Sequence, residues 1–283
     1  MLIIESISDL RQAVREWRSK DLSVAFVPTM GNLHAGHVHL VREAKQLADK
    51  VVVSVFVNPT QFSPGEDFDA YPRTPAEDSE KLRSAAVDLL FMPSVAELYP
   101  TGSGVTTFVE VPGLSDELCG RFRPGHFRGV ATIVSKLFNL VQPDVALFGE
   151  KDYQQLLIIR RMVADLDFPV RIRSVPTIRE PSGLAMSSRN AYLTSEQKEQ
   201  AAILYRCLCL AAEAICRGDS DFDRIERQQI ETLQAAGFRP DYFSVRRESD
   251  LVPAGQDDSH LVILAAAWLG KTRLIDNVRL TRS

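Results

Sequence analysis

The chain has 283 residues, of which 45% are hydrophobic and 25% charged, values typical of globular proteins. The net charge of −4 creates no positive field that would gather nucleic acid, and the longest apolar run, residues 261–269, is far shorter than the roughly 20 residues of a membrane-spanning helix. The first residues lack the basic segment of a signal peptide. We therefore expect a cytoplasmic protein of one large domain or two that binds neither nucleic acid nor membranes.

In the first two thirds of the chain, apolar strand-like segments alternate with helix-like segments. The expected strands are 23–29, 50–58, 87–93, 144–150 and 169–177, and the expected helices are 36–49, 74–86, 126–142 and 153–166. Thr74 and Glu77 predict a capping box at the start of the second of these helices. Apolar strands separated by helices indicate a parallel sheet covered on both faces, and right-handed crossovers then give a doubly wound, Rossmann-like α/β domain.

After about residue 180 the pattern changes. Two helices are expected in succession, at 195–218 and 222–237, with Gly218 and Gly237 placed where helices commonly end. Strand-like segments follow at 241–247, 260–268 and 272–280. We therefore expect a Rossmann-like domain over 1–177 and a smaller α+β domain over 178–283. The segment 104–111, GVTTFVEV, reads as an additional strand outside the alternation.

The cysteines favour a reducing compartment. None of the four lies in a CxxC motif, and three of them, Cys207, Cys209 and Cys216, share one helix-like stretch. This spacing matches neither a disulfide framework nor a zinc site, so we interpret all four, Cys119 included, as packing residues.

The stretch VPTMGNLHAGHVHL, residues 27–40, contains three of the five histidines. It follows a predicted central strand and leads into a helix, which is the place where ligands bind in open parallel sheets. Gly31 and Gly36 allow close backbone approach, and the free N–H groups at the helix start suit a phosphate. Because positions three apart share a helix face, His34 and His37 can point to one target.

Two other interpretations of this stretch stay open. A zinc site would need three or four ligands, yet no glutamate stands in an HExxH pattern and no second His or Cys cluster supplies partners. Two solvated histidines at a helix start would give the same spacing. The short HxGH pattern is therefore weak by itself.

A second motif downstream strengthens the phosphate interpretation. The histidine stretch resembles the HxGH signature of nucleotidylyl transferases and class I aminoacyl-tRNA synthetases, whose second signature, similar to KMSKS, lies on a mobile loop that binds the triphosphate. LAMSSRN, residues 184–190, stands just after the last strand of the first predicted domain. Ala185 replaces the lysine of that signature, whereas Arg189 supplies a delocalised cation for phosphate.

Three more stretches narrow the resemblance: VSVFVNPTQF at 53–62, RFRPGHFRGVATIV at 121–134 and FGEKDYQQL at 148–156. Together with the two signatures, and in this order, they resemble the pantoate–β-alanine ligase family from residue 1 to about residue 280. Asn32, Ala35 and Ser182 depart from the family pattern, but none of these departures removes a group with an assigned chemical role.

The resemblance implies an enzyme that uses ATP to join pantoate to β-alanine through a pantoyl adenylate, with release of AMP and pyrophosphate. It implies His37 as the proton donor, His34 along the phosphates, and Lys151 to neutralise developing charge. The ATP-binding residues that we expect on this basis are Met30, Gly31, Asn32, Leu33, His34, Ala35, Gly36, His37, Gly149, Glu150, Lys151, Asp152, Ile178, Met186, Ser187, Ser188 and Arg189.

For pantoate and β-alanine the resemblance implies Gln61, Gln155 and Asn58, since an amide offers both a donor and an acceptor. Mg²⁺ would accompany ATP, held by phosphates and waters, with Asp78 or Glu77 helping through water. No tightly bound organic cofactor is expected.

The resemblance also has consequences for assembly and motion. It implies a homodimer formed through the first domain, with residues 104–111 or their neighbours at the interface. The second domain would act as a lid that closes on ATP about a hinge near residues 175–179 and excludes water.

Each group also has an ordinary interpretation when it is taken alone. Lys151–Asp152 would suit a solvated turn, Gln61 and Gln155 would suit the ends of elements, and Ser187–Arg189 would suit a linker. Three arginines, Arg121, Arg123 and Arg128, fit an anion patch or a solvated face equally well.

Three other functions are compatible with parts of the pattern. They are a plain adenylyl or cytidylyl transferase, a synthetase-like tRNA binder, and a catalytically silent nucleotide sensor of the same fold. The acidic charge balance and the lack of an anticodon-binding domain argue against tRNA. The retained His34, His37 and Lys151 argue against a sensor.

Overall fold

The structure, a computed structural model, describes residues 1–63, 65–104 and 106–282. The chain divides into two compact units. Unit 1 comprises Met1–Glu150 and Ile158–Pro176, and unit 2 comprises Lys151–Leu157 and Thr177–Ser283. The main division therefore falls at residue 176, and the short segment 151–157 groups with unit 2.

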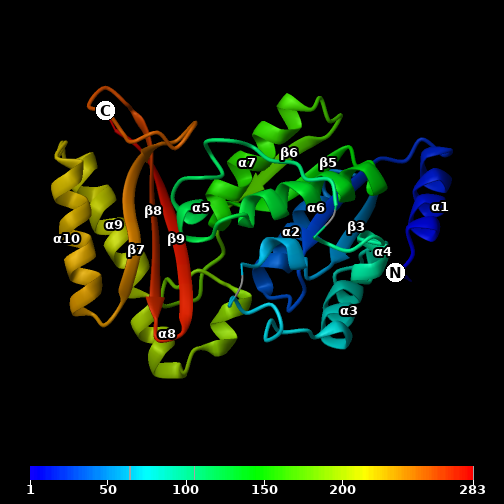
Figure 1. Ribbon diagram of the computed structural model, residues 1–283, viewed down its shortest axis with the longest axis horizontal. Helices are drawn as coiled ribbons and strands as arrows, with labels where there is room; N and C mark the ends of the chain where they lie inside the picture. The colour runs from blue at the N-terminus through cyan, green and yellow to red at the C-terminus, as the bar shows by residue number, and fades with distance from the viewer. Residues whose placement is uncertain (64, 105, 283) are drawn as a thin grey trace. The chain divides into compact units, whose positions relative to one another are not determined.

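Unit 1 is built on a six-stranded parallel sheet with the order β1-β4-β3-β2-β5-β6 (Figure 1). Its strands are β1 (Leu2–Ile4), β2 (Val24–Thr29), β3 (Lys50–Val55), β4 (Leu89–Phe91), β5 (Val145–Gly149) and β6 (Arg171–Val175). The chain proceeds outward from β2 to β3 and β4, and then returns to the other side of β2 with β5. In open parallel sheets, ligands bind beyond the carboxyl ends of the two strands at such a reversal, which here are β2 and β5.

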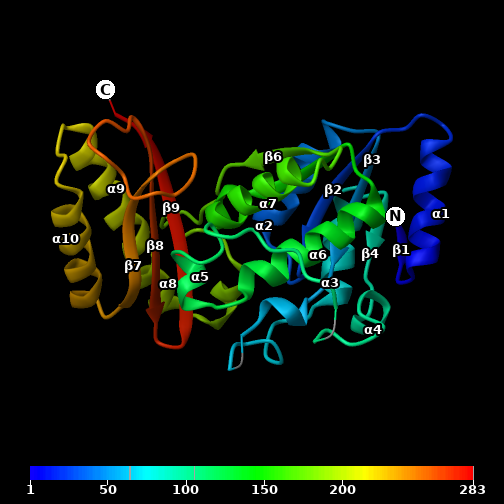
Figure 2. The ribbon, with the colours of Figure 1, turned by 45° about the horizontal axis from the view of Figure 1, so that its top comes forward.

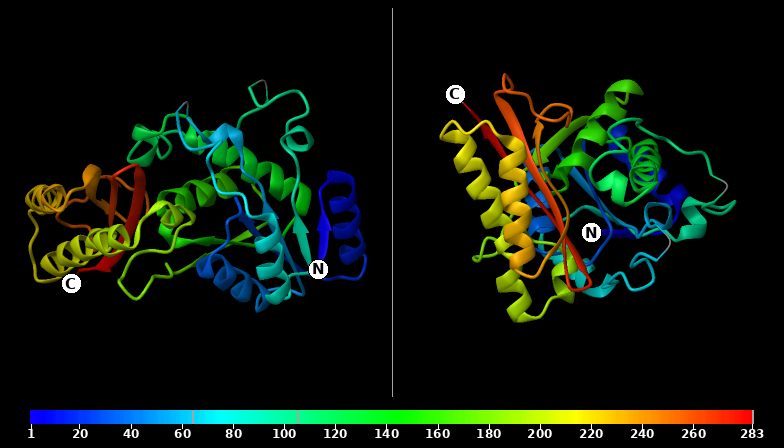
Figure 3. Two further views of the ribbon diagram at one scale, coloured as in Figure 1. Left: turned by 90° about the horizontal axis from the view of Figure 1, so that it is seen from below. Right: turned by 60° about the vertical axis from the view of Figure 1, so that its left-hand side comes forward.

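Helices cover both faces of this sheet. The helices of this part of the chain are α1 (Ile7–Arg18), α2 (Ala35–Lys45), α3 (Pro75–Ser84), α4 (Val95–Leu98), α5 (Cys119–Phe122), α6 (His126–Val141) and α7 (Tyr153–Asp165). α2 and α3 lie on one side of the sheet and α6 lies on the other (Figure 3, left). Leu40 of α2 and Leu82 of α3 pack with one face, and Phe138 of α6 meets Phe26 and Phe148 edge to face. Burial on both sides explains why β2 and β3 are almost continuously apolar.

Unit 2 contains a three-stranded antiparallel sheet, β7-β8-β9, with α9 and α10 packed on one face and the shorter α8 preceding them (Figure 2). The strands are β7 (Arg239–Arg247), β8 (His260–Leu269) and β9 (Thr272–Thr281), and the helices are α8 (Ser195–Ala201), α9 (Ile203–Cys216) and α10 (Phe222–Ala235). Leu208 of α9, Leu233 of α10 and Ile263 of β8 are fully buried in the shared core. The predicted fold class, a Rossmann-like parallel sheet with a smaller α+β part, is confirmed.

Short 3₁₀ helices carry several residues of interest. They are η1 (Pro59–Gln61), η2 (Glu150–Asp152) and η3 (Ser188–Tyr192). Gly218 and Gly237 end their helices with φ of 97° and 84°, as predicted. Every helix among the described residues is too short or too polar to cross a bilayer.

Three local predictions are wrong. The expected strand at 104–111 is absent from its described residues, 104 and 106–111, where the backbone of Val109 instead bonds the Thr132 hydroxyl of α6 at 2.9 Å. The expected helix 195–218 is two helices that meet at Ala202. Thr74 precedes α3 as expected, but its ψ of 55° is not that of a capping residue, and its hydroxyl caps nothing.

Candidate active site

The loop from β2 to α2, residues 30–34, lies where the strand order reverses. Two consecutive left-handed residues shape it, Gly31 with φ of 84° and Asn32 with φ of 49°. A β-carbon on Gly31 would lie 3.0 Å from Val55 Cγ1 and 3.1 Å from Asp78 Oδ2. Both the conformation and the surroundings therefore favour glycine at position 31.

The fully buried carboxylate of Asp78 holds this loop. Its Oδ2 accepts the N–H of Asn32 at 2.8 Å, and its Oδ1 accepts the N–H of Leu33 at 2.7 Å. Lys81, one turn along α3, donates to the Leu33 carbonyl at 2.8 Å. Asp78 thus fixes the left-handed turn, whereas Glu77 is exposed and lies 3.9 Å from Lys81.

The structure brings the rings of His34 and His37 together, with centroids 4.1 Å apart. His34 precedes α2, and its Nδ1 accepts the N–H of Gly36 at 3.2 Å. His37 Nδ1 accepts the N–H of His34 at 3.3 Å. Because each Nδ1 accepts a backbone hydrogen bond, the neutral form of each ring carries its proton on Nε2. Two Nε2 donors therefore lie beside the N-terminus of α2.

The described residues place no third metal ligand beside this histidine pair, which argues against the zinc interpretation. Among residues 1–63, 65–104 and 106–282, no group of three or more His, Cys, Asp or Glu side chains is arranged to hold a metal ion. The loop geometry instead suits an anion, because the N-terminus of α2 and the two histidine rings beside it offer hydrogen-bond donors.

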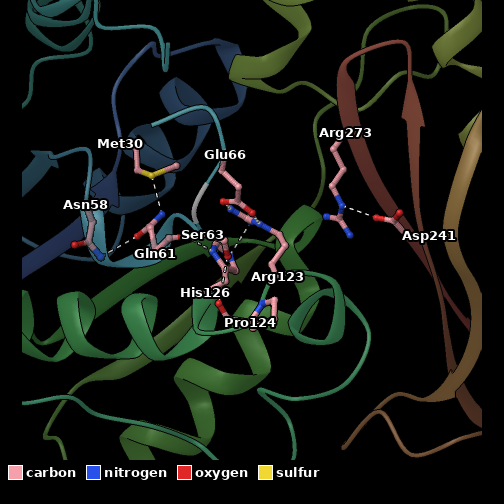
Figure 4. A network of polar contacts seen from close by, with 10 residues as sticks. All are labelled: Met30, Asn58, Gln61, Ser63, Glu66, Arg123, Pro124, His126, Asp241 and Arg273. Atoms are coloured by element: carbon pink, nitrogen blue, oxygen red, sulfur yellow. Dashed lines mark hydrogen bonds and ion pairs between the residues drawn. The ribbon is translucent and has the colours of Figure 1, made fainter. Parts of the chain in front are cut away.

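Gln61 lies in η1, directly after β3, and its Nε2 is 2.8 Å from Met30 Sδ (Figure 4). Asn58, which is 1% exposed, donates from Nδ2 to Gln61 Oε1 at 3.2 Å and to the Gly129 carbonyl at 3.1 Å. Its Oδ1 accepts the Tyr99 phenol at 2.9 Å. The amide of Asn58 is thus engaged inside the protein and orients Gln61.

Burial raises the pKa of the Tyr99 phenol above its usual value. The phenol therefore remains a donor to Asn58 at neutral pH.

The second segment at the reversal consists of Gly149, the last residue of β5, and Glu150, the first residue of η2. A β-carbon on Gly149 would meet no described atom within 4 Å, so the backbone lies open there. Glu150 is buried. Within unit 1, the reversal of strand order therefore brings together the histidine loop and this open backbone.

Lys151, Asp152 and Gln155 group with unit 2. Asn277 of β9 donates to the Lys151 carbonyl at 2.9 Å, which fixes the backbone of this turn. The Lys151 ammonium is 3.9 Å from Asp152 Oδ2, and Gln155 is half-buried in the first turn of α7. The sequence pattern did not single out Asn277.

Residues 178–186, which precede the Met-Ser-Ser segment, form a hairpin. The N–H of Met186 donates to the Ile178 carbonyl at 2.9 Å, and the N–H of Glu180 donates to the Leu184 carbonyl at 2.8 Å. The hairpin turns at Gly183, where φ is 95°. The backbone hydrogen bonds of this segment are therefore made within the segment itself.

The base of the hairpin is tied to β9. Arg179 donates to both carboxylate oxygens of Asp276, at 2.6 and 3.0 Å, and its guanidinium lies 3.6 Å from the centre of the Tyr205 ring. At the other end, Ser187 Oγ accepts the N–H of Arg189 at 3.3 Å as η3 begins. Ile178, Met186, Ser187, Ser188 and Arg189 are all half-buried.

The three arginines of the RFRPGHFR stretch do not form one anion patch. Arg123 is paired with Glu66 at 2.7 Å, and the exposed Arg128 lies over the ring of Phe108 at 4.6 Å. Arg121 is exposed.

Comparison with known proteins identifies the family. The family model described as pantoate-beta-alanine ligase matches residues 2–279. The pantothenate synthetase of Methylococcus capsulatus (strain Bath) is 61% identical over 278 residues, covering 98% of this chain and 97% of the relative. The chain belongs to the pantoate–β-alanine ligase family.

Solved structures agree with this membership. The pantothenate synthetase of Thermus thermophilus superposes with a TM-score of 0.91 at 47% identity, over 98% of this chain and 99% of that one. The pantoate–β-alanine ligase of Francisella tularensis gives a TM-score of 0.81 at 36% identity, over 98% and 97%. The chain is therefore a ligase that joins pantoate to β-alanine, which replaces the nucleotidylyl transferase, tRNA-binding and sensor alternatives.

Proposed function

We propose that this ligase activates pantoate with ATP, forming pantoyl adenylate and pyrophosphate, and then transfers the pantoyl group to β-alanine with release of AMP. The observation that carries the proposal is the pair of backbone-held rings, His34 and His37, at the N-terminus of α2. The Francisella relative, which was crystallised in complex with β,γ-ATP and β-alanine, supports the use of ATP.

In the first step, a carboxylate oxygen of pantoate attacks the α-phosphorus, and the bond from that phosphorus to pyrophosphate breaks. The Nε2 groups of His34 and His37 donate to phosphate oxygens, and His37 is the proton donor toward the leaving group. Because both rings are already held by backbone N–H groups, little reorganisation is needed as charge develops.

The nucleotide would lie along the backbone of the two loops of unit 1. Met30–His37 and the open backbone of Gly149 and Glu150 provide its binding surface there. On unit 2 we assign Asp152, Ile178 and Met186 to the nucleotide, Lys151 to the developing negative charge, and Ser187, Ser188 and Arg189 to the β- and γ-phosphates.

Mg²⁺ would arrive with ATP and supply positive charge to the triphosphate. The residues present fit an ion held chiefly by phosphate oxygens and water, because the two oxygens of Asp78 already accept loop N–H groups. Contact of Asp78 or Glu77 with such an ion would then run through water.

Pantoate would be bound by Gln61 and Gln155, whose amides can pair with its hydroxyls and carboxylate. Asn58 acts behind Gln61 as a positioning residue, since its amide is saturated by internal partners. In the second step the β-alanine amine attacks the acyl carbon, a C–N bond forms, and the C–O bond to AMP breaks. Closure of unit 2 as a lid would exclude water from the labile adenylate.

We further propose a homodimer formed through unit 1. Phe108, which is 37% exposed, and Phe122, which is 46% exposed, are large apolar side chains in and near the segment that the family resemblance places at the interface. Sedimentation of the purified enzyme would give twice the monomer mass.

The four free cysteines suit a reducing compartment such as the cytoplasm.

Isotope transfer tests the proposed chemistry. Pantoate labelled with ¹⁸O in its carboxylate should yield AMP that carries one ¹⁸O, because the oxygen that attacks phosphorus leaves with AMP. A route through an acyl phosphate would instead produce ADP and place the label in inorganic phosphate. Mass spectrometry of the nucleotide products separates the two routes, and labelled phosphate with unlabelled nucleotide would refute the adenylate.

A further inference from the structure

Next to Gln61 lies a chain of polar contacts that the proposed chemistry does not use (Figure 4). Arg123 donates from Nε and Nη2 to the two oxygens of Glu66, each at 2.7 Å. Its remaining nitrogen, Nη1, is 3.0 Å from His126 Nε2. His126 Nδ1 is 2.7 Å from the backbone carbonyl oxygen of Gln61.

These partners define the protonation of His126. A carbonyl oxygen only accepts, so Nδ1 must carry the hydrogen that points to Gln61. A guanidinium only donates, so Nε2 must be the acceptor that faces Arg123. His126 therefore links the guanidinium of Arg123 to the backbone of Gln61 as a neutral ring. The carbonyl can only accept and the guanidinium can only donate, so a single tautomer satisfies both contacts.

The surroundings leave this chain little freedom. His126 is 9% exposed, and the side chain of Arg123 is 14% exposed. The first turns of α6 press against η1, because a β-carbon on Gly129 would lie 2.2 Å from the Thr60 carbonyl oxygen. The end of η1, with Gln61, therefore rests on α6, and His126 binds it at the first residue of that helix.

The same chain holds the loop that follows η1. Glu66 belongs to this loop, and Ser63 Oγ donates to the Pro124 carbonyl at 3.2 Å. Arg123 thus holds two parts of the chain. It binds the loop through Glu66, and it contacts Gln61 through His126. All three nitrogens of its fork are used, which a lysine could not reproduce.

We propose that His126 and Arg123 are positioning residues for pantoate, which set the place of Gln61 and of the loop after it. The proposal rests on the proposed binding of pantoate by Gln61. Both residues act on Gln61 and the loop after it, and the proposal gives them no contact with the phosphates. Their loss should therefore weaken pantoate binding and leave ATP binding and the chemical step largely intact.

Paired substitutions of His126 test this arrangement in the full-length enzyme. His126→Asn keeps a donor at the place of Nδ1, His126→Gln keeps a group only at the place of Nε2, and His126→Leu keeps neither. His260→Leu, at an exposed position in β8, is the matched control. Gln61→Ala reports separately whether Gln61 binds pantoate.

Steady-state kinetics should show the KM for pantoate raised about tenfold in His126→Leu and His126→Gln, the factor expected when a buried carbonyl loses its donor. The KM for ATP and kcat should stay within about threefold, and His126→Asn should recover most of the loss. Arg123→Lys should raise the KM for pantoate by less, about threefold, because the donor to Gln61 remains.

Two results would overturn the proposal. One is an unchanged KM for pantoate in His126→Gln and Arg123→Lys while Gln61→Ala raises it. The other is an equal loss in kcat and in both KM values that His126→Asn does not recover, which would indicate a general structural role. If Gln61→Ala itself leaves pantoate binding intact, the assignment of Gln61 fails, and the positioning role fails with it.

Discussion

The two loops that carry the proposed phosphate-binding side chains each depend on one buried aspartate, but the aspartates act differently. In unit 1, Asp78 accepts two N–H groups of the histidine loop itself. In unit 2, Asp276 binds Arg179 at the base of a hairpin that closes its own backbone bonds. The first loop cannot shift without leaving buried N–H groups unpaired. The second keeps its own backbone bonds, and its aspartate contacts it only through the side chain of Arg179.

The largest effect should come from the histidine loop. His37→Ala should lower the rate of pantoyl adenylate formation by about 10²–10³-fold, because a prearranged donor is lost from a site of developing charge. Rapid-quench assays with ATP and pantoate measure this rate. His39→Ala, on the same helix, should change it by less than about twofold, and equal effects of the two substitutions would break the assignment.

The next effect is on folding. Asp78→Ala should lower the free energy of unfolding by about 2–5 kcal/mol, because the N–H groups of Asn32 and Leu33 lose their hydrogen-bond acceptor in the protein interior. Urea unfolding measures the change. Glu77→Ala, which removes an exposed carboxylate of the same helix, should cost less than about 0.5 kcal/mol. Equal stabilities of the two variants would show that Asp78 does not hold the loop.

The ion pair of unit 2 gives a contrasting result. Asp276→Leu should cost about 3 kcal/mol, because Arg179 keeps its charge without a partner. The double variant Arg179→Leu with Asp276→Leu should be more stable than Asp276→Leu alone. No such recovery is available to Asp78, whose partners are backbone groups. A double variant less stable than the single one would contradict the view of Asp276 as a simple tie at the hairpin base.

The smallest effect concerns the support of Asn58. Tyr99→Phe should cost about 1 kcal/mol, the value of one buried hydrogen bond. Folding raises the pKa of Tyr99, so its contribution is complete below the unfolded pKa of about 10 and declines as the pH rises through the folded value. Unfolding at pH 7, 9 and above 10 should therefore show a difference from wild type that is constant and then shrinks. A difference that grows with alkaline pH would contradict this sign.

The parallel sheet could be predicted because its strands are apolar on both faces and separated by helices with clear periodicity. The first strand was missed because β1 has only three residues, Leu2–Ile4, and sits at the edge of the sheet. The segment 104–111 was assigned to a strand because it is rich in β-branched residues, yet the backbone of Val109 finds a side chain of α6 in place of a neighbouring strand. Propensity cannot reveal such a partner.

The side chains of the candidate site were easier to predict than their supports. His34 and His37 share a local spacing that the helix start converts into contact. Asp78 binds the backbone of Leu33, which is 45 positions away, and Asn277 binds the backbone of Lys151, which is 126 positions away. Contacts between such distant positions leave no local pattern in the sequence. One signal was present in β9, where Asp276 and Asn277 are consecutive polar residues that the fold buries on opposite faces of a strand.

The central claim is the adenylate, and a single turnover tests it most directly. Enzyme in excess would be mixed with ATP, Mg²⁺ and pantoate without β-alanine, then quenched and analysed by mass spectrometry. The account predicts pantoyl adenylate in an amount close to the limiting substrate, and its conversion to pantothenate and AMP when β-alanine is added. Absence of the adenylate, while the same enzyme still makes pantothenate once β-alanine is present, would contradict it.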